Sequence, residues 1–384
     1  MRKNHFSTYF RRVGRKDIWE VRKIITKDSQ AYRVLAILCM SGECSEQAIC
    51  LVMPQESYRQ KVLQKLITDK LITRYQKDDV RGYRLAKRGK DLLLMMDRES
   101  FAFFLLDGVD FSMRRPVLRY RRRQHRISET LAMMERAKVE TYRTNKNLVF
   151  EKTPRQSEEK AQSAFYLSRE VKVQTDLTRK MVNSKMTGAW LARDVVWLCY
   201  NTADEMPRWY ENVERRANIL VCSMLREYLS KQRNANALLF GISMEQAKRC
   251  LADGKQRAYF MHCSFERFCF IPLDSRGIVL LQMLNEKEIY DHLFSILTED
   301  LEEKQEGEYI IHDGFNQDGQ PVLICIDCDL KRLVQFQTQL AYIGRKGEVI
   351  CFDFQKEAIC SYCGEETKIS EVDFETVRES FFPG

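Results

Sequence analysis

Apolar residues in the first quarter of the chain recur at helical spacing and predict three short helices in succession. Asp28 or Ser29 can cap the first helix, and Ser45 can cap the second. The third helix begins near Ser57 and carries one apolar stripe. This stripe consists of Val62, Leu63, Leu66 and Ile67.

A hairpin and a further helix are predicted after these three helices. Two strand-like runs flank the segment Lys77–Gly82, whose Asp pair and Gly82 favour a turn. The run from Lys90 to Phe104 then predicts one more helix. Three helices followed by a hairpin are typical of a winged helix-turn-helix, so we expect such a DNA-binding domain at 29–110.

The face of the third helix opposite its apolar stripe is polar and basic. Lysine and glutamine pair with guanine and adenine in the major groove, so this face is expected to contact DNA bases. The predicted contacts of the helix are Ser57, Tyr58, Gln60, Lys61, Gln64, Lys65 and Thr68. The predicted phosphate contacts of the hairpin are Arg74, Lys77, Arg81 and Arg84. Arg59 lies on the apolar side and is expected to pack or to contact a phosphate.

Charge is distributed unevenly along the chain. Residues 1–160 contain 36 Lys+Arg and 20 Asp+Glu, a net charge of +16, whereas the remaining residues contain 27 and 34, a net charge of −7. A basic front half favours a polyanionic partner, with double-stranded DNA the first candidate. The leader 1–28 is either solvated or an arm along the DNA. The basic helix and linker 111–163 is expected to add phosphate contacts through Arg119, Arg121, Arg122, Arg123 and Arg126.

The remainder, 164–384, alternates strand-like and helix-like patterns and predicts a mixed α/β domain, with a further division near 300–320 as one option. The predicted fold class is therefore α+β. No run of 18 apolar residues and no secretory signal are present, so neither a membrane partner nor export is expected. The 13 cysteines are then best interpreted as reduced thiols of a cytoplasmic protein.

Signals for catalysis or cofactors are weak. Two CxxC pairs, Cys325 with Cys328 and Cys360 with Cys363, have zinc-like spacing, but 31 residues separate them, and buried thiols are the favoured interpretation. The triplet from Glu170 to Lys172 is similar to metal-dependent nuclease strands, as is the segment 353–356. Such triplets arise often by chance in a sequence that is 30% charged. No cofactor is expected, and an enzyme is the less favoured hypothesis.

The segment 188–214, GAWLARDVVWLCYNTADEMPRWYENVE, resembles the replication-relaxation family of plasmids and integrative conjugative elements in Gram-positive bacteria. The residues that carry the resemblance are Gly188, Tyr200, Asn201, Trp209 and Glu214. The segments 123–135 and 271–284 are also similar. The resemblance implies a mobile-element protein that binds DNA and assists plasmid replication or relaxase-driven transfer. It implies no catalytic residue.

Three functions therefore compete. The first is a DNA-binding accessory protein, with a transfer origin as a candidate site and a relaxase, other mobilisation proteins or a second copy of the chain as partner. The second is a winged-helix transcriptional repressor of the element. The third is a metal-dependent nuclease that the winged helix targets to DNA.

Overall fold

The computed structural model contains two compact units. The N-terminal unit comprises Met1–Ala132 and Tyr142–Thr144, and the C-terminal unit comprises Met133–Thr141 and Asn145–Gly384. The residues that the structure describes are 25–106, 117–151, 160–172, 181, 183–205, 210–229, 232–254, 265–302 and 310–382. Most of the predicted leader 1–28 lies outside these ranges, as does Trp209.

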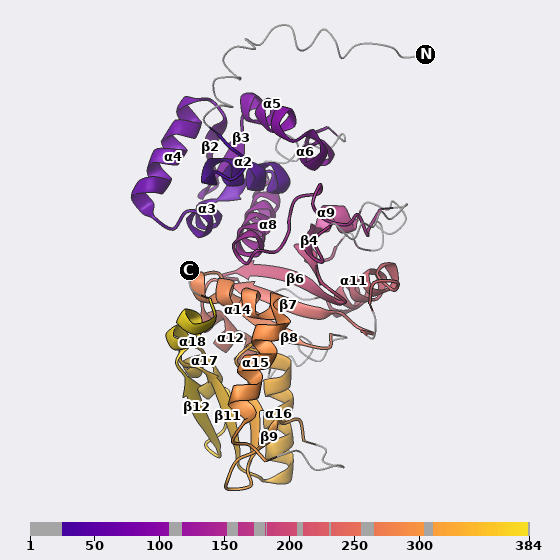
Figure 1. Ribbon diagram of the computed structural model, residues 1–384, viewed down its shortest axis with the longest axis vertical. Coiled ribbons are helices and arrows are strands. Elements are labelled where there is room, and N and C mark those ends of the chain that lie inside the picture. The colour runs from indigo at the N-terminus through magenta and orange to yellow at the C-terminus, as the bar shows by residue number, and fades with distance from the viewer. Residues whose placement is uncertain are drawn as a thin grey trace. The chain divides into compact units, whose positions relative to one another are not determined.

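The N-terminal unit combines helices with a small antiparallel sheet (Figure 1). Its helices are α2 (Gln30–Ser41), α3 (Glu46–Val52), α4 (Glu56–Thr68), α5 (Lys87–Met96), α6 (Arg98–Leu105) and α8 (Leu118–Arg136) as far as Ala132. Its strands pair in the order β1-β3-β2, and they are β1 (Cys44–Ser45), β2 (Ile72–Lys77) and β3 (Val80–Leu85). The unit thus includes the first part of α8, which the sequence analysis assigned to the basic helix and linker 111–163.

Helix caps account for where these helices begin. The side chains of Ser29 and Ser45 cap α2 and α3, which confirms both predicted starts. The single helix predicted over Lys90–Phe104 is wrong, because two helices occupy this stretch. Asp97 ends α5 and caps α6, accepting a hydrogen bond from the backbone N–H of Ser100 at 3.0 Å.

The hairpin has a tighter turn than the sequence predicts. Lys77 pairs with Val80, and the turn between them consists of Asp78 and Asp79, whose φ angles are 52° and 59°. Two residues at positive φ are what a type I′ hairpin turn requires, and aspartate tolerates this conformation. Gly82 was predicted as a turn residue but lies within β3.

The core of the N-terminal unit includes an aromatic cluster that joins segments distant in sequence. The ring of Tyr32 lies 6.1 Å from that of Phe101 and 6.2 Å from that of Tyr142. The hydroxyl of Ser100 lies 2.8 Å from that of Thr144. The short segment Tyr142–Thr144 therefore belongs to this core, although it follows the rest of the unit in sequence.

The C-terminal unit contains a five-stranded mixed sheet in the order β4-β5-β6-β7-β8. The first two pairings are antiparallel and the last two are parallel, with α11 (Glu211–Met224) and α12 (Met244–Gly254) as the crossovers. The strands are β4 (Ser163–Leu167), β5 (Gly188–Ala192), β6 (Val195–Ala203), β7 (Asn236–Gly241) and β8 (Phe268–Pro272). The short helix α9 (Ser168–Val171) follows β4, and α14 (Ser275–Asn285) and α15 (Lys287–Thr298) follow β8.

A second sheet in this unit has the order β12-β11-β10-β9. β10, β11 and β12 are parallel, and α16 (Leu330–Ile343) connects β10 to β11. The strands are β9 (Gly314–Phe315), β10 (Pro321–Ile324), β11 (Gly347–Phe352) and β12 (Thr367–Val372). The short helix α17 (Lys356–Cys360) precedes β12, and α18 (Phe374–Phe381) follows it. Residues of both sheets pack into one buried apolar cluster, among them Phe270 and Leu323.

The described chain is thus a mixture of helices and several sheets, which confirms the predicted α/β character of the back half. Asn201, one of the residues that carry the family resemblance, lies within β6. Among the described helices, none combines the length and apolarity needed to cross a bilayer.

Candidate nucleic-acid interface

The predicted DNA-contacting residues of α4 all lie on its exposed side. Leu66 is buried, and the other three apolar-stripe residues are half-buried, so the helix packs through the stripe that the sequence predicts. The exposed residues are Ser57, Tyr58, Gln60, Lys61, Gln64, Lys65 and Thr68. Arg59 is not among them, because its guanidinium donates to the carbonyls of Met53 and Pro54 at 2.9 and 3.0 Å and so secures the turn between α3 and α4.

The four predicted phosphate contacts of the hairpin differ in their exposure to solvent. Arg74, Lys77 and Arg81 are exposed, and Arg74 donates to the hydroxyl of Tyr83 at 3.1 Å. Arg84 is half-buried and turned inward. The exposed turn adds two carboxylates to an otherwise basic hairpin, because its residues are both aspartates.

Glu43 is a fully buried carboxylate, and three side chains donate to it. Its Oε2 accepts from Arg84 Nη2 at 2.7 Å, and its Oε1 accepts from Arg121 Nη2 at 2.7 Å. The Nε2 atom of His125 lies 2.8 Å from Oε1. Burial alone would raise the pKa of Glu43, but the hydrogen bonds from His125, Arg121 and Arg84 outweigh it and lower the pKa to about 2. We call these four residues the Glu43 cluster.

The Glu43 cluster also fixes the hairpin. Arg121 donates to the carbonyls of Lys77 and Val80, the latter at 2.9 Å, on either side of the turn. The guanidinium carbons of Arg84 and Arg121 lie 3.5 and 4.6 Å from the centre of the Tyr75 ring. The start of α8 is therefore held against the tip of the hairpin.

Two predicted DNA contacts are corrected by this arrangement. Arg121 is fully buried and Arg84 is half-buried against Glu43, so both act in holding the hairpin rather than in presenting charge to solvent. Their partner was missed, because nothing local in the sequence pairs Glu43 with an arginine 78 positions away.

Gly82 gains a different role from the one that the sequence suggests. A Cβ atom at this position would lie 2.6 Å from His125 Nε2 and 2.8 Å from Glu43 Oε1. These distances are too short for any side chain. Gly82 thus allows the carboxylate and the imidazole to approach the backbone of β3.

The arginine run of α8 separates into two faces. Arg121, Gln124, His125 and Ser128 recur at helical spacing, and each is buried or half-buried. On the other face, Arg119 and Arg122 are exposed, while Arg123 and Arg126 are half-buried. The arginine run, which is continuous in sequence, is therefore divided between a face of α8 that packs inside the unit and a face that is exposed or half-buried.

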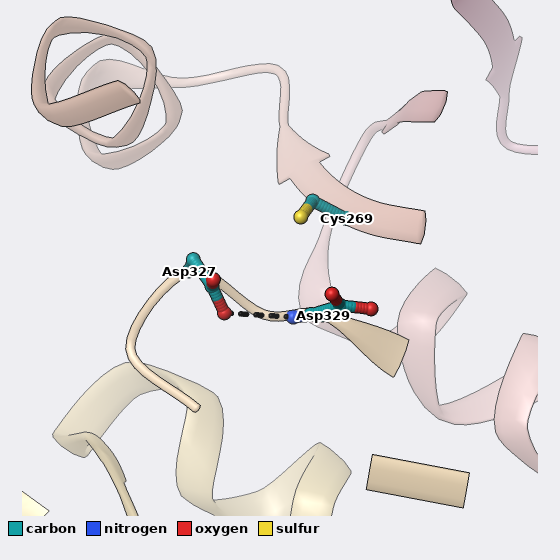
Figure 2. A group of neighbouring side chains, drawn as sticks. All are labelled: Cys269, Asp327 and Asp329. Atoms are coloured by element: carbon teal, nitrogen blue, oxygen red, sulfur yellow. Dashed lines mark hydrogen bonds between the residues drawn. The ribbon is translucent and has the colours of Figure 1, made fainter. Parts of the chain in front are cut away.

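A buried acidic cluster lies in the C-terminal unit, formed by Cys269, Asp327 and Asp329 (Figure 2). One potential ligand atom from each residue lies within 4.8 Å of the other two. Figure 2 shows the two aspartates on one loop opposite Cys269 on β8, with Asp329 N donating to Asp327 Oδ1 at 3.1 Å. Carboxylate and thiol groups can bind a metal ion. The charges around them therefore decide whether the cluster is a metal site or a structural contact.

Arg267 neutralises part of this negative charge, and burial together with the charge of Asp327 raises the pKa of Asp329, which favours its neutral form. Arg267 forms an ion pair with Asp327, and its Nε lies 3.5 Å from Asp329 Oδ2. The hydroxyl of Tyr290 donates to Asp327 at 3.1 Å, and Asp329 caps α16 through Oδ1. Burial raises the pKa of the Cys269 thiol, which favours its neutral form. We therefore interpret the cluster as a structural ion pair that ties β8 to the loop before α16.

The cysteines of the two CxxC pairs differ in burial. Cys325 and Cys328 are buried whereas Cys360 is exposed, and with Cys363 they form no four-cysteine ligand group within the described residues. Burial raises the pKa of Cys325 and of Cys328. Cys325 and Cys328 are therefore buried thiols of the core.

The nuclease-like carboxylates are likewise in separate structural contacts. Glu170 accepts from Lys146 at 2.9 Å and lies in α9 rather than in a strand. Asp353 accepts from the backbone N–H of Phe374 at 3.3 Å, and Lys356 pairs with Glu371. The contacts described for them do not join these carboxylates in one metal-binding site.

The segment with the family resemblance has a structural explanation. The buried carboxylate of Glu214 accepts from the Tyr200 hydroxyl at 3.1 Å, from the Ser184 hydroxyl at 2.7 Å and from the backbone N–H of Lys185 at 2.8 Å. A Cβ at Gly188 would lie 2.3 Å from the Phe165 ring. These residues therefore hold α11 and β5 in place.

No protein-family model, no curated protein and no solved structure matches this chain. The resemblance to the replication-relaxation family therefore stays a prediction from the quoted residues. The geometry of the N-terminal unit is the remaining guide to function.

Proposed function

We propose that the chain is a double-stranded DNA-binding protein whose N-terminal unit is a winged helix-turn-helix. In this proposal α4 is the recognition helix and the β2–β3 hairpin is the wing. The order of α2, β1, α3, α4, β2 and β3 supports it, since this is the order of elements in winged-helix domains.

The observation that carries the proposal is the exposed face of α4. Lys61, Gln64 and Lys65 lie at positions i, i+3 and i+4 of the helix, and all three are exposed. Glu56, the acidic residue in the first turn of α4, accepts from Gln60 at 3.0 Å, and Asp69 follows the end of the helix. A face of this kind offers donors to guanine and adenine.

The family resemblance extends the proposal to the biological setting. We infer an accessory protein of a mobile genetic element, which acts in the cytoplasm with a relaxase or another mobilisation protein. A repressor would use the same front surface, so the DNA sequences that the protein selects distinguish the two. Sequencing fragments that the full-length protein captures is expected to yield a transfer origin or replication origin, whereas enrichment of promoters alone would favour the repressor.

Removing the α4 side chains should weaken DNA binding strongly. We expect Lys61→Ala/Gln64→Ala/Lys65→Ala to lose at least about tenfold in affinity for the selected duplex, because base contacts contribute about 1–3 kcal/mol each. The measurement is a gel-shift titration at several salt concentrations.

A matched control for this variant is Arg345→Ala/Lys346→Ala, which removes two exposed cations from the C-terminal unit. We expect it to change affinity by less than about twofold, as surface substitutions outside a site do. Equal binding by the α4 variant and the wild type, or binding by the wild type that is insensitive to salt, would refute the proposed function.

The two aspartates of the turn should oppose binding if the hairpin is a wing. Asp78→Asn/Asp79→Asn is expected to tighten binding by about twofold to fivefold at low salt, with a smaller gain as salt rises, because it removes two negative charges near phosphates. Asparagine tolerates positive φ, so the turn should persist. Unchanged affinity with an unchanged melting temperature would show that the turn lies away from the DNA.

A further inference from the structure

The outer face of α8 lies beside the tip of the hairpin. Arg121 donates to carbonyls on both sides of the Asp78–Asp79 turn, which places the first turns of α8 against it. Arg119 and Arg122 flank Arg121 in sequence and are exposed. Lys77 of β2 is exposed in the same region, so the hairpin tip and the start of α8 present their cations together.

The helix segment that carries this face is basic, whereas the hairpin tip beside it also carries the exposed carboxylates of Asp78 and Asp79. Between Val117 and Ser128 the sequence contains no acidic residue. The residues of the outer face are Arg119, Arg122, Arg123 and Arg126, at i, i+3, i+4 and i+7. They extend over about 10 Å of helix axis at 1.5 Å per residue. That length corresponds to about three base-pair steps of one DNA strand, which rise roughly 3.4 Å each.

We propose that this outer face is a second phosphate-binding surface, which contacts the DNA backbone beside the site that α4 and the hairpin bind. The inference rests on the proposed function and extends it from a recognition helix with a wing to a wider footprint. Its occupant is the duplex backbone, because arginine is suited to bidentate phosphate contacts that do not depend on sequence. A lipid surface fits less well, since the opposite face of α8 packs against the hairpin and offers no apolar side to a membrane.

The Glu43 cluster explains why this surface can act together with the wing. Arg121 is fixed by the carboxylate and by the hairpin carbonyls at the same time. The neighbouring arginines are therefore presented from a helix whose position relative to the hairpin is set by buried hydrogen bonds. Such a preorganised surface loses less conformational freedom on binding than a solvated tail does.

The test uses the full-length chain, a short duplex that contains only the selected site, and the same duplex extended by about ten base pairs on each side. The variant is Arg119→Gln/Arg122→Gln, which removes exposed charge, keeps good helix formers and leaves Arg121 in place. Arg345→Gln/Lys346→Gln is the matched control. Affinity is measured against salt concentration, and the protected region is mapped by footprinting.

On the extended duplex we expect the variant to reduce the slope of log K against log salt by about 2 and to shorten the protected region on one side. On the short duplex the variant and the wild type should bind alike. If the variant equals the wild type on the extended duplex while the α4 variant loses binding, this inference is wrong and the proposed function stands. If the wild type binds neither duplex, the proposed function fails, and the inference fails with it.

Discussion

Replacing Glu43 with leucine should destabilise the N-terminal unit by about 3–5 kcal/mol, because it leaves a fully buried arginine without its carboxylate. Arg121 can keep its bonds to the hairpin carbonyls, but its charge then has no counterion in a buried setting. The expected result is faster hydrogen exchange in peptides that cover β2 and β3. Peptides from the C-terminal unit serve as the internal reference.

The matched variant is Glu43→Leu/Arg121→Met, which removes both charges. Replacing a buried ion pair by apolar groups costs less than breaking it, so the double variant should recover part of the stability. If the destabilisation of the double variant equals the sum of the destabilisations of Glu43→Leu and Arg121→Met, the two residues do not interact.

The pH dependence of the same cluster separates ion pairing from packing. The pKa of Glu43 falls from its ordinary value of 4.5 to about 2 in the folded chain. A lowered pKa contributes stability that is complete above pH 4.5 and is lost as the pH falls towards 2. The stability difference between the wild type and Glu43→Gln should therefore narrow over this range. If the difference in the free energy of unfolding is the same at pH 6 and at pH 3, Glu43 stabilises the unit through packing alone.

Lys146→Met should have a comparable effect on the C-terminal unit, about 3–5 kcal/mol. The ammonium of Lys146 is buried and donates to Glu170 at 2.9 Å and to the carbonyls of Phe165 and Thr141 at 2.7 and 3.1 Å. Methionine fills the space, but it leaves the buried Glu170 carboxylate without this counterion and removes one donor from each of the two carbonyls. Chemical denaturation of the full-length chain measures the loss.

The exposed Lys185, in the same unit, provides the control for this substitution. Lys185→Met should change the stability by less than about 0.5 kcal/mol. Similar losses for the two variants would indicate that removing any lysine from this unit destabilises it, which contradicts a specific role for the buried pair.

Local patterns in the sequence were sufficient for most elements of the N-terminal unit. Ser29 and Ser45 cap helices where the sequence predicts, because a cap depends on residues within one turn. The exposed face of α4 is also as predicted, since helical periodicity determines which side chains share a face. Gly82 was misinterpreted as a turn residue. Glycine is required at this position because a Cβ atom would lie too close to Glu43 and His125, which are distant in sequence.

Contacts between distant segments could not be inferred in the same way. An arginine in a basic run is normally solvated, and only a partner 78 positions away makes Arg121 a buried residue. The cluster of Cys269, Asp327 and Asp329 likewise requires a strand and a loop to meet across nearly 60 residues. Periodicity and local composition do not indicate which distant segments will be in contact.

The position of Arg121 also determines where an isolated DNA-binding fragment can end. A fragment that stops before Leu118 removes two of the three donors to Glu43 and exposes the carbonyls of the hairpin tip. Extension through Ala132 restores these donors, but Tyr142, which stacks on Tyr32, would still be absent. The smallest fragment that retains every part of this unit therefore continues to Thr144.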